Sequence, residues 1–259
     1  MAHSKPVRVY DININTEEYN LYKEMHKNQT LDFVIKKKEE YSKLNKTKMT
    51  MKHALSLLNN FVDPSDPDID VTNITHAYQT AERIRQKYPD NKEYQLLGLI
   101  HDIGKILYTF NEPSWAVVGD TYVLGCKFPE SIVFYDTLKE SPDFNKYDEI
   151  GIYSKGCGMD NLHITFGHDE YLYMVLCGNK HNFSQEYVDI IRYHSLYPWH
   201  TDGKYHVFMN DKDRQIFIDM MDFNQFDLYS KYDKLVIDDT IINYYNDLLD
   251  EYFPNELNW

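Results

Sequence analysis

The stretch LLGLIHDIGKIL, residues 96–107, places a histidine, an aspartate and a lysine in an otherwise apolar segment. Its apolar spacing predicts a helix from about Lys92 through Leu107 with too few polar positions for a surface helix. A buried carboxylate is costly unless it meets a cation, a hydrogen-bond network or a metal ion. A metal ion is the interpretation of Asp102 that also uses His101.

The helical geometry of this pair favours two metal ions over one. Adjacent residues on a helix point about 100° apart, so His101 and Asp102 do not easily chelate one ion from the same face. Asp102 has two oxygens and can bridge ions about 3.5–4 Å apart, with His101 binding one of them. On the dipeptide alone, a buried hydrogen-bonded pair of purely structural role remains an alternative.

Further candidate ligands lie beside apolar sequence elsewhere in the chain. They are His76, His168, His194 and Asp227. With His101 and Asp102 they form a nitrogen and oxygen donor set without thiolate, which suits iron, manganese or zinc. Each histidine could equally be a satisfied core residue, and Asp227 could form a surface pair with Lys231, four residues later.

Other polar residues receive simpler interpretations. The remaining histidines, His26 among them, occur in polar or turn contexts and are interpreted as non-ligands. Asp169 and Glu170 are interpreted as acidic residues that favour a helix N-terminus.

Composition bounds the class of protein. The 259 residues carry a formal net charge of −14, with 41 acidic and 27 basic residues, which disfavours nucleic acid and anionic membranes as partners. The three cysteines form no CxxC pair, so we expect no disulfide framework and a reducing, cytoplasmic location. We find no membrane span, signal peptide or glycine-rich phosphate loop, and therefore expect neither flavin nor nicotinamide.

The apolar pattern predicts an all-α bundle with long loops and at most a short hairpin, which we place within residues 111–129. We expect a single domain over residues 1–259, with residues 1–19 extended or poorly ordered. The predicted helices cover 17–44, a segment capped by Thr50, 73–88, 92–107, about 168–177, a segment from a Ser184 cap through 197, a segment from about Asp211, and 240–253.

Several longer motifs are more specific than the histidine-aspartate pair. They are SDPD at 65–68, HAYQTAE at 76–82, LIHDIGKIL at 99–107, EPSWAVVGDTY at 112–122, GHDEYLYMV at 167–175, IRYHSLYPWHT at 191–201 and FNQFDLYSK at 223–231. Over roughly residues 20–259 the sequence resembles the myo-inositol oxygenase family of the HD-domain superfamily. HDxGK occurs across the superfamily, whereas WAVVGDT with YPWHT does not.

The resemblance implies an HD-domain-like helical bundle that is monomeric and has myo-inositol and O2 as its partners. It implies an O2-dependent cleavage of the myo-inositol ring to D-glucuronate. It implies a mixed-valent Fe(II)/Fe(III) pair, with one iron held by His76, His101 and Asp227. His168 and His194 would hold the other iron, to which inositol hydroxyls bind, and Asp102 would bridge the two.

The resemblance also implies substrate contacts and catalytic roles. The implied contacts are Asp63, Ser65, Lys105, Gly119, Asp120, His194, Ser195 and Lys231, with Arg8 as the best but poorly aligned candidate for a family arginine. Asp102 and Lys105 are the implied catalytic residues, and Lys105 is placed to hydrogen-bond or help deprotonate a coordinated hydroxyl.

Two other function classes remain to be weighed. A metal-dependent phosphohydrolase is the main alternative, because HD-domain phosphodiesterases share the same types of ligand. Here the segment after Lys105, ILYTFNEPSWAVVGD, lacks a Gly-Tyr-Pro signature, and the chain is acidic. A non-catalytic scaffold would need this many polar ligands to converge for structure alone, which is energetically expensive.

Overall fold

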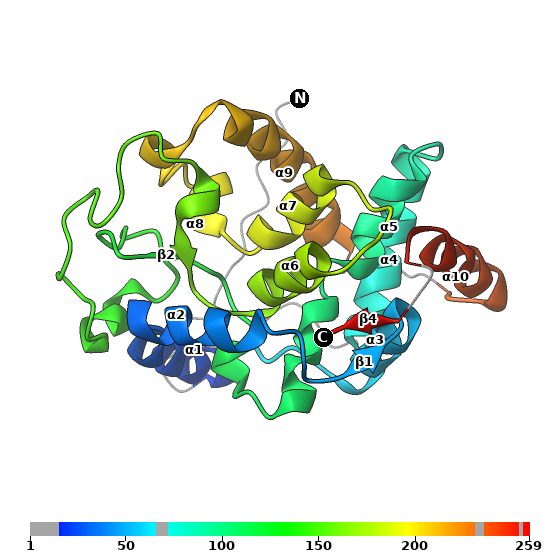
Figure 1. Cartoon of the computed structure of the whole chain (residues 1–259), viewed down its shortest axis with the longest axis horizontal. Helices are drawn as coiled ribbons and strands as arrows, with labels where there is room; N and C mark the ends of the chain where they lie inside the picture. Colours follow the sequence, from blue (N-terminus) through cyan, green and yellow to red (C-terminus); the bar gives the residue numbers. More distant parts are fainter. Residues whose placement is uncertain (1–15, 66–71, 231–235, 254–255) are drawn as a thin grey trace.

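Helices dominate the computed structural model, which describes residues 16–65, 72–230, 236–253 and 256–259 (Figure 1). The α-helices are α1 Glu17–Asn28, α2 Leu31–Tyr41, α3 Met51–Leu57, α4 Asn73–Lys87, α5 Lys92–Ile100, α6 His168–Gly178, α7 Gln185–Tyr193, α8 Tyr197–His200, α9 Asp211–Ser230 and α10 Asp239–Tyr252. The 3₁₀ segments are η1 Leu58–Asn60, η2 Ile103–Phe110, η3 Ser114–Ala116, η4 Tyr135–Glu140, η5 Met159–Asn161 and η6 His206–Phe208. The all-α prediction is confirmed.

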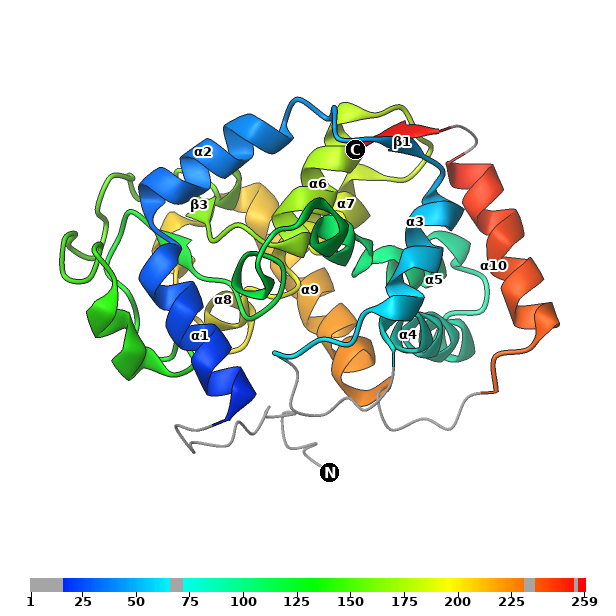
Figure 2. The same cartoon turned by 90° about the horizontal axis from the view of Figure 1, so that it is seen from below.

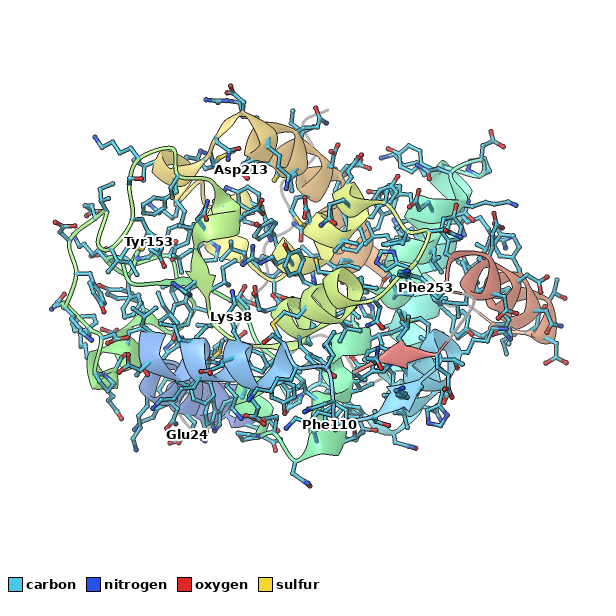
Figure 3. All side chains as sticks on the ribbon, in the orientation of Figure 1. Glu24, Lys38, Phe110, Tyr153, Asp213 and Phe253 are labelled. Atoms are coloured by element: carbon cyan, nitrogen blue, oxygen red, sulfur yellow. The ribbon has the colours of Figure 1, made fainter. Side chains whose placement is uncertain are left out.

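The helices pack as a bundle around a continuous apolar core. α4 packs on α5 and α9, and α6 packs on α7 and η2. α1 and α2 lie at one end of the molecule and α10 at the other in both views (Figures 1 and 2). Side chains fill the space between the ribbons in Figure 3. Within the described ranges, every helix is too short or too polar to span a bilayer.

The N-terminal segment forms two helices, so the single helix predicted over 17–44 is wrong. α1 ends at Asn28, and the backbone N–H of Gln29 caps it by donating to Met25. Thr30 then caps α2, its hydroxyl accepting from the Phe33 N–H. Because α1 begins at Glu17, the extended N-terminal segment expected over 1–19 is too long by three residues, and residues 1–15 lie outside the description.

Other helix starts follow their predicted capping residues. The Thr50 hydroxyl accepts from the His53 N–H at 3.1 Å and begins α3, as predicted. α4 begins at Asn73 and ends before Pro89, and Ser184 occupies the N-cap position of α7. The helix predicted from Ser184 through 197 is too long, because α7 ends at Tyr193 and a separate α8 follows.

The helix predicted over 92–107 also stops early. α5 ends at Ile100, His101 is its C-cap, and the chain continues as the 3₁₀ segment η2. A tertiary contact accompanies the change: a Cβ added at Gly104 would lie 1.9 Å from the carbonyl oxygen of His168. The first turn of α6 therefore lies against this segment, and His101 and Asp102 occupy a helix end rather than a helix interior.

The short strands pair over long sequence separations. β2 Val123–Leu124 pairs antiparallel with β3 His163–Ile164, with Val123 opposite Ile164. β1 Lys48–Met49 pairs antiparallel with β4 Leu257–Asn258, with Met49 opposite Leu257. The pattern allowed at most a short hairpin within 111–129; β2 lies in this range, but its partner lies some forty residues later.

One buried histidine outside the site gives the fold a pH-dependent stability. His26 on α1 is fully buried, and its Nδ1 hydrogen-bonds the Thr137 hydroxyl at 2.6 Å. Burial lowers the pKa of His26 from 6.5 to about 3. The sequence-based view of His26 as a residue in a polar context misses this burial.

We expect the free energy of unfolding to fall as the pH drops from about 6.5 toward 3, because only the unfolded state then protonates His26. The contribution is about 1.4 kcal/mol per pH unit within this window and absent above it. Thermal melting from pH 7 to pH 4.5 measures the slope, and His26→Gln should flatten it. An unchanged slope in that variant would show that other groups cause the loss.

Candidate metal centre

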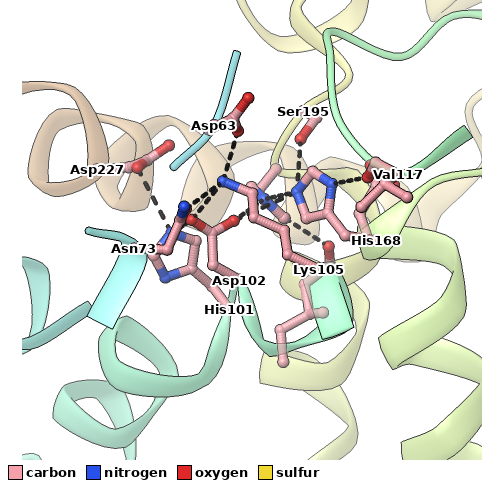
Figure 4. A network of polar contacts seen from close by, with 12 residues as sticks. Asp63, Asn73, His101, Asp102, Lys105, Val117, His168, Ser195 and Asp227 are labelled. Atoms are coloured by element: carbon pink, nitrogen blue, oxygen red, sulfur yellow. Dashed lines mark hydrogen bonds and ion pairs between the residues drawn. The ribbon is translucent and has the colours of Figure 1, made fainter. Parts of the chain in front are cut away.

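The candidate ligands come from five segments that meet inside the bundle (Figure 4). His76 lies on α4 and Asp227 on α9, and His168 begins α6. His101 is the C-cap of α5, with Asp102 next to it, and His194 is the C-cap of α7. Each is buried, with at most 6% of its surface exposed. Two of the groups they form are suited to hold a metal ion, His76 with His101 and Asp102, and Asp102 with His168 and His194.

Backbone carbonyls fix the rings of three of these histidines. The Nδ1–H of His101 donates to Gly98 at 2.8 Å, that of His168 to Val117 at 2.8 Å, and that of His194 to Ile191 at 2.7 Å. A carbonyl accepts only, so Nδ1 carries a proton in each ring and Nε2 is the nitrogen left to bind a metal ion. Histidines that bind metals are commonly oriented in this way.

The lone pairs of His168 and His194 face one another. Their Nε2 atoms lie 3.0 Å apart, and one oxygen of Asp102, Oδ1, lies 3.3 Å from the first and 3.6 Å from the second. Three acceptors at this spacing repel one another unless a proton or a metal ion lies between them. Burial lowers the pKa of His194, but the contact with Asp102 outweighs it and the pKa is raised.

The second oxygen of Asp102, Oδ2, faces the other group of ligands. It lies 3.5 Å from His101 Nε2 and 3.9 Å from His76 Nε2, while Asp227 Oδ1 lies 2.9 Å from His76 Nε2 and 3.5 Å from His101 Nε2. Nitrogen and oxygen ligands about 2.0–2.2 Å from one ion lie roughly 3–3.5 Å apart. The donor set therefore fits hard or borderline metal ions, with one oxygen of Asp102 toward each group.

Lys105 lies beside this carboxylate as a buried cation. Its Nζ donates to Asp102 Oδ2 at 2.8 Å, to Asp63 Oδ2 at 2.8 Å and to Asn73 Oδ1 at 2.9 Å. Burial lowers the pKa of Lys105, but the two carboxylates outweigh it and the pKa is raised. Lys105 is therefore a hydrogen-bond donor in this arrangement, and it is poorly suited to take a proton from a hydroxyl.

The carboxylates in the centre are held ionised. Burial alone would raise the pKa of Asp102. Lys105 and His101 lower this pKa by more than burial raises it, so it lies well below the usual range. Hydrogen bonds with His101 and His76 likewise overcome burial and lower the pKa of Asp227. Both side chains therefore supply negative charge across the physiological range.

A pocket opens onto these ligands. It is lined by Asp63, Ser65, His76, Asp102, Lys105, Gly119, Asp120, His168, His194, Ser195, Tyr197 and Asp227. All the implied substrate contacts within the described residues line it, whereas Lys231 and Arg8 lie outside the description. Ser65 is fixed by two hydrogen bonds to Asp63 Oδ1, from its N–H at 2.8 Å and its hydroxyl at 2.6 Å.

Two residues at the site were missed by sequence reasoning. Asn73 accepts from Lys105 and donates its side-chain amide to the Phe61 carbonyl at 2.8 Å. Tyr197 lines the pocket. Asn73 reads as an ordinary residue at a helix start, and Tyr197 belongs to the quoted YPWHT segment without a distinguishing local pattern.

Glu170 lies in the first turn of α6, as interpreted from the sequence, but the helix start alone does not explain it. Glu170 is buried, and its carboxylate pairs with Arg192 Nε at 2.8 Å and with Lys38 Nζ at 2.7 Å. These cations hold the pKa of Glu170 below its usual value although burial raises it. Because Glu170 follows His168 by two residues and Arg192 precedes His194 by two, the pair joins the segments that carry these histidines.

Comparison with known proteins extends this picture to nearly the whole chain. A family model described as myo-inositol oxygenase matches residues 16–259. The chain is 45% identical over 245 residues to an inositol oxygenase of Danio rerio, covering 93% of this chain and 88% of that one. It is 46% identical to that of Dictyostelium discoideum, covering 92% and 85%, and 43% identical to that of Homo sapiens, covering 93% and 86%.

These matches cover most of this chain and most of each relative. The residues that match the family model, 16–259, include the candidate ligands on α4, α5, α6, α7 and α9. The chain belongs to the myo-inositol oxygenase family.

Proposed function

We propose that this chain is a di-iron oxygenase that uses O2 to cleave the ring of myo-inositol and form D-glucuronate. The observation that carries the proposal is the pair of donor groups that share Asp102, with one oxygen of Asp102 toward each group. His76, His101 and Asp227 would hold one iron and His168 and His194 the other. An iron pair, when bound, supplies Lewis acidity toward the polyol and redox capacity toward O2.

The chain's own residues suit a neutral polyol. The pocket presents hydroxyl, carboxylate and ammonium groups from Ser65, Ser195, Asp63, Asp120 and Lys105. Such groups accept from and donate to ring hydroxyls, and they fix which carbons face the metal side of the pocket. We assign Lys105 the role of donor to a substrate oxygen beside Asp102. Its three N–H groups now contact Asp102, Asp63 and Asn73, so a ring hydroxyl would take the place of one of these acceptors.

The same pocket disfavours the phosphohydrolase alternative. Among its described lining residues, Lys105 is the one lysine or arginine, and two carboxylates already pair with it. A phosphate ester would therefore find little uncompensated positive charge beyond the metal ions. A neutral substrate avoids this difficulty.

The proposal predicts that iron-loaded protein converts myo-inositol and O2 to D-glucuronate, and that metal removal abolishes conversion. Product formation and O2 uptake should be measured on the same sample, before and after chelation and after iron is restored. A phosphatase screen with several divalent ions provides the comparison. Full activity without iron, or phosphatase activity without inositol oxidation, would overturn the proposal.

A further inference from the structure

A buried glutamine lies at the break between α1 and α2. Gln29 has no exposed surface, and its side-chain amide bonds two distant backbone segments. Nε2 donates to the Phe166 carbonyl at 2.6 Å and the Trp115 carbonyl at 3.3 Å, and Oε1 accepts from the Phe166 N–H at 3.0 Å. This one side chain therefore joins the segment around residue 115 to that around residue 166.

The two joined segments meet again two residues further along each. The Val117 carbonyl accepts both from the His168 backbone N–H at 2.9 Å and from His168 Nδ1 at 2.8 Å. Val117 follows Trp115 by two residues, and His168 follows Phe166 by two. Gln29 thus fixes the position of the Val117 carbonyl relative to His168, the histidine that this carbonyl orients.

This dependence distinguishes His168 from two other candidate ligands. His101 and His194 are oriented by the carbonyls of Gly98 and Ile191, each three residues earlier in its own helix. The carbonyl that orients His168 lies 51 residues away in the sequence. A helix supplies the first two contacts by its own geometry, whereas the third depends on how separate segments are held together.

Helix α1, which ends next to Gln29, also supports the pocket beside His168. The Tyr22 hydroxyl on α1 accepts from the Asp120 N–H at 2.9 Å. Gly119 lies over Met25, whose sulfur is 3.1 Å from the position that a Cβ at residue 119 would take. α1 therefore contacts both the Gly119–Asp120 turn and, through Gln29 at its end, the segment that leads into His168.

We propose that Gln29 is a positioning residue for His168, and that it thereby sets the affinity of the metal position formed by His168, His194 and Asp102. The inference rests on the proposed metal pair. The residues of the other metal position, His76, His101 and Asp227, lie on or at the end of α4, α5 and α9. α4 packs directly on both α5 and α9. Loss of the Gln29 amide should therefore weaken one metal position and spare the other.

The test compares Gln29→Leu with Gln95→Leu in the full-length chain. Gln95 is a matched control because it is equally buried and its Nε2 donates to two carbonyls, of Tyr88 at 2.9 Å and Pro89 at 3.0 Å. Its Oε1 accepts from the Tyr244 hydroxyl at 2.6 Å. The control thus loses the same kind of contact without touching the segments around residues 115 and 166.

Ferrous iron is titrated anaerobically into metal-free protein, and bound iron is counted at each step. Wild type and Gln95→Leu should bind two ions. Gln29→Leu should bind the first normally and the second about 10- to 100-fold more weakly, the range observed when groups that orient metal ligands are replaced. Thermal melting of both variants checks that they are destabilised to a similar degree.

A double-mutant cycle identifies which position is affected. If Gln29 acts through His168, Gln29→Leu should cause no further loss of iron affinity in a His168→Ala background. If Gln29→Leu fails to fold, Gln29→Met replaces it in the cycle, since its unbranched, flexible side chain has a similar volume and makes none of the three hydrogen bonds.

Two results overturn the inference while leaving the metal pair intact. One is a Gln29 variant that binds both ions with wild-type affinity, and the other is an equal loss at both positions that the Gln95 variant reproduces. Wild-type protein that binds fewer than two ions would instead refute the proposed metal pair, and the inference with it.

Discussion

Asp102→Ala is expected to abolish metal binding and oxygenase activity together. Its two oxygens lie 3.3 Å from His168 Nε2 and 3.5 Å from His101 Nε2, so one truncation removes a ligand from each donor group. Two described carboxylates nearby are already engaged, since Asp227 faces the His76 side and Asp63 pairs with Lys105. Bound iron, product formation and O2 uptake measure the loss.

Asp102→Asn is the matched control for shape. The amide keeps the volume of the side chain and an oxygen that can accept from Lys105, but it lacks the charge that two cations require. We expect it to fold like the wild type and still fail to retain both ions. Two ions bound at wild-type affinity in either variant would refute the bridging role of Asp102.

Gly104→Ala is expected to be the most destabilising single methyl addition at the site. The new Cβ would lie 1.9 Å from the His168 carbonyl oxygen and 2.7 Å from its carbonyl carbon, so backbone must move on one side or the other. Overpacking typically costs about 1–3 kcal/mol, and a rigid backbone neighbour places this case at or above the upper end. Because His168 moves with α6, metal affinity should fall as well.

Gly178→Ala, at the last residue of α6, is the control for Gly104→Ala. It adds the same methyl group, but against a side chain rather than against backbone. There the nearest atom is Cδ1 of Leu44 at 2.2 Å, the end of a side chain that can rotate away. Thermal melting should show a much smaller loss than for Gly104→Ala, and bound iron should be unchanged. Equal losses in the two variants would show that the close approach at Gly104 has no special importance.

Local sequence signals predicted most helix starts correctly. Thr50 begins α3 through its hydroxyl, and α4 stops before Pro89, since each of these signals acts within a few residues. The breaks inside continuous apolar patterns were missed. Residues 17–44 and 92–107 both read as single helices, yet one is interrupted at Gln29 and the other ends at Ile100.

Both breaks have tertiary contacts that no local window contains. The Gln29 amide bonds Phe166, 137 residues away, and η2 at Gly104 lies against the backbone of His168. The role of Glu170 was incompletely predicted for the same reason, because its partners Lys38 and Arg192 come from other helices. Charge beside a helix start explained Glu170 locally, and only the packed structure shows it as a buried ion pair.

The sequence by itself determined the helical class and predicted the candidate nitrogen and oxygen donors and the resemblance that connects them, because residue type and spacing are local properties. Only the tertiary structure decided that Asp102 turns one oxygen toward each donor group, that Lys105 is a caged cation and that His168 depends on a distant carbonyl. These features arise from contacts between segments far apart in the chain, and the free energy of packing rather than helix periodicity sets their geometry.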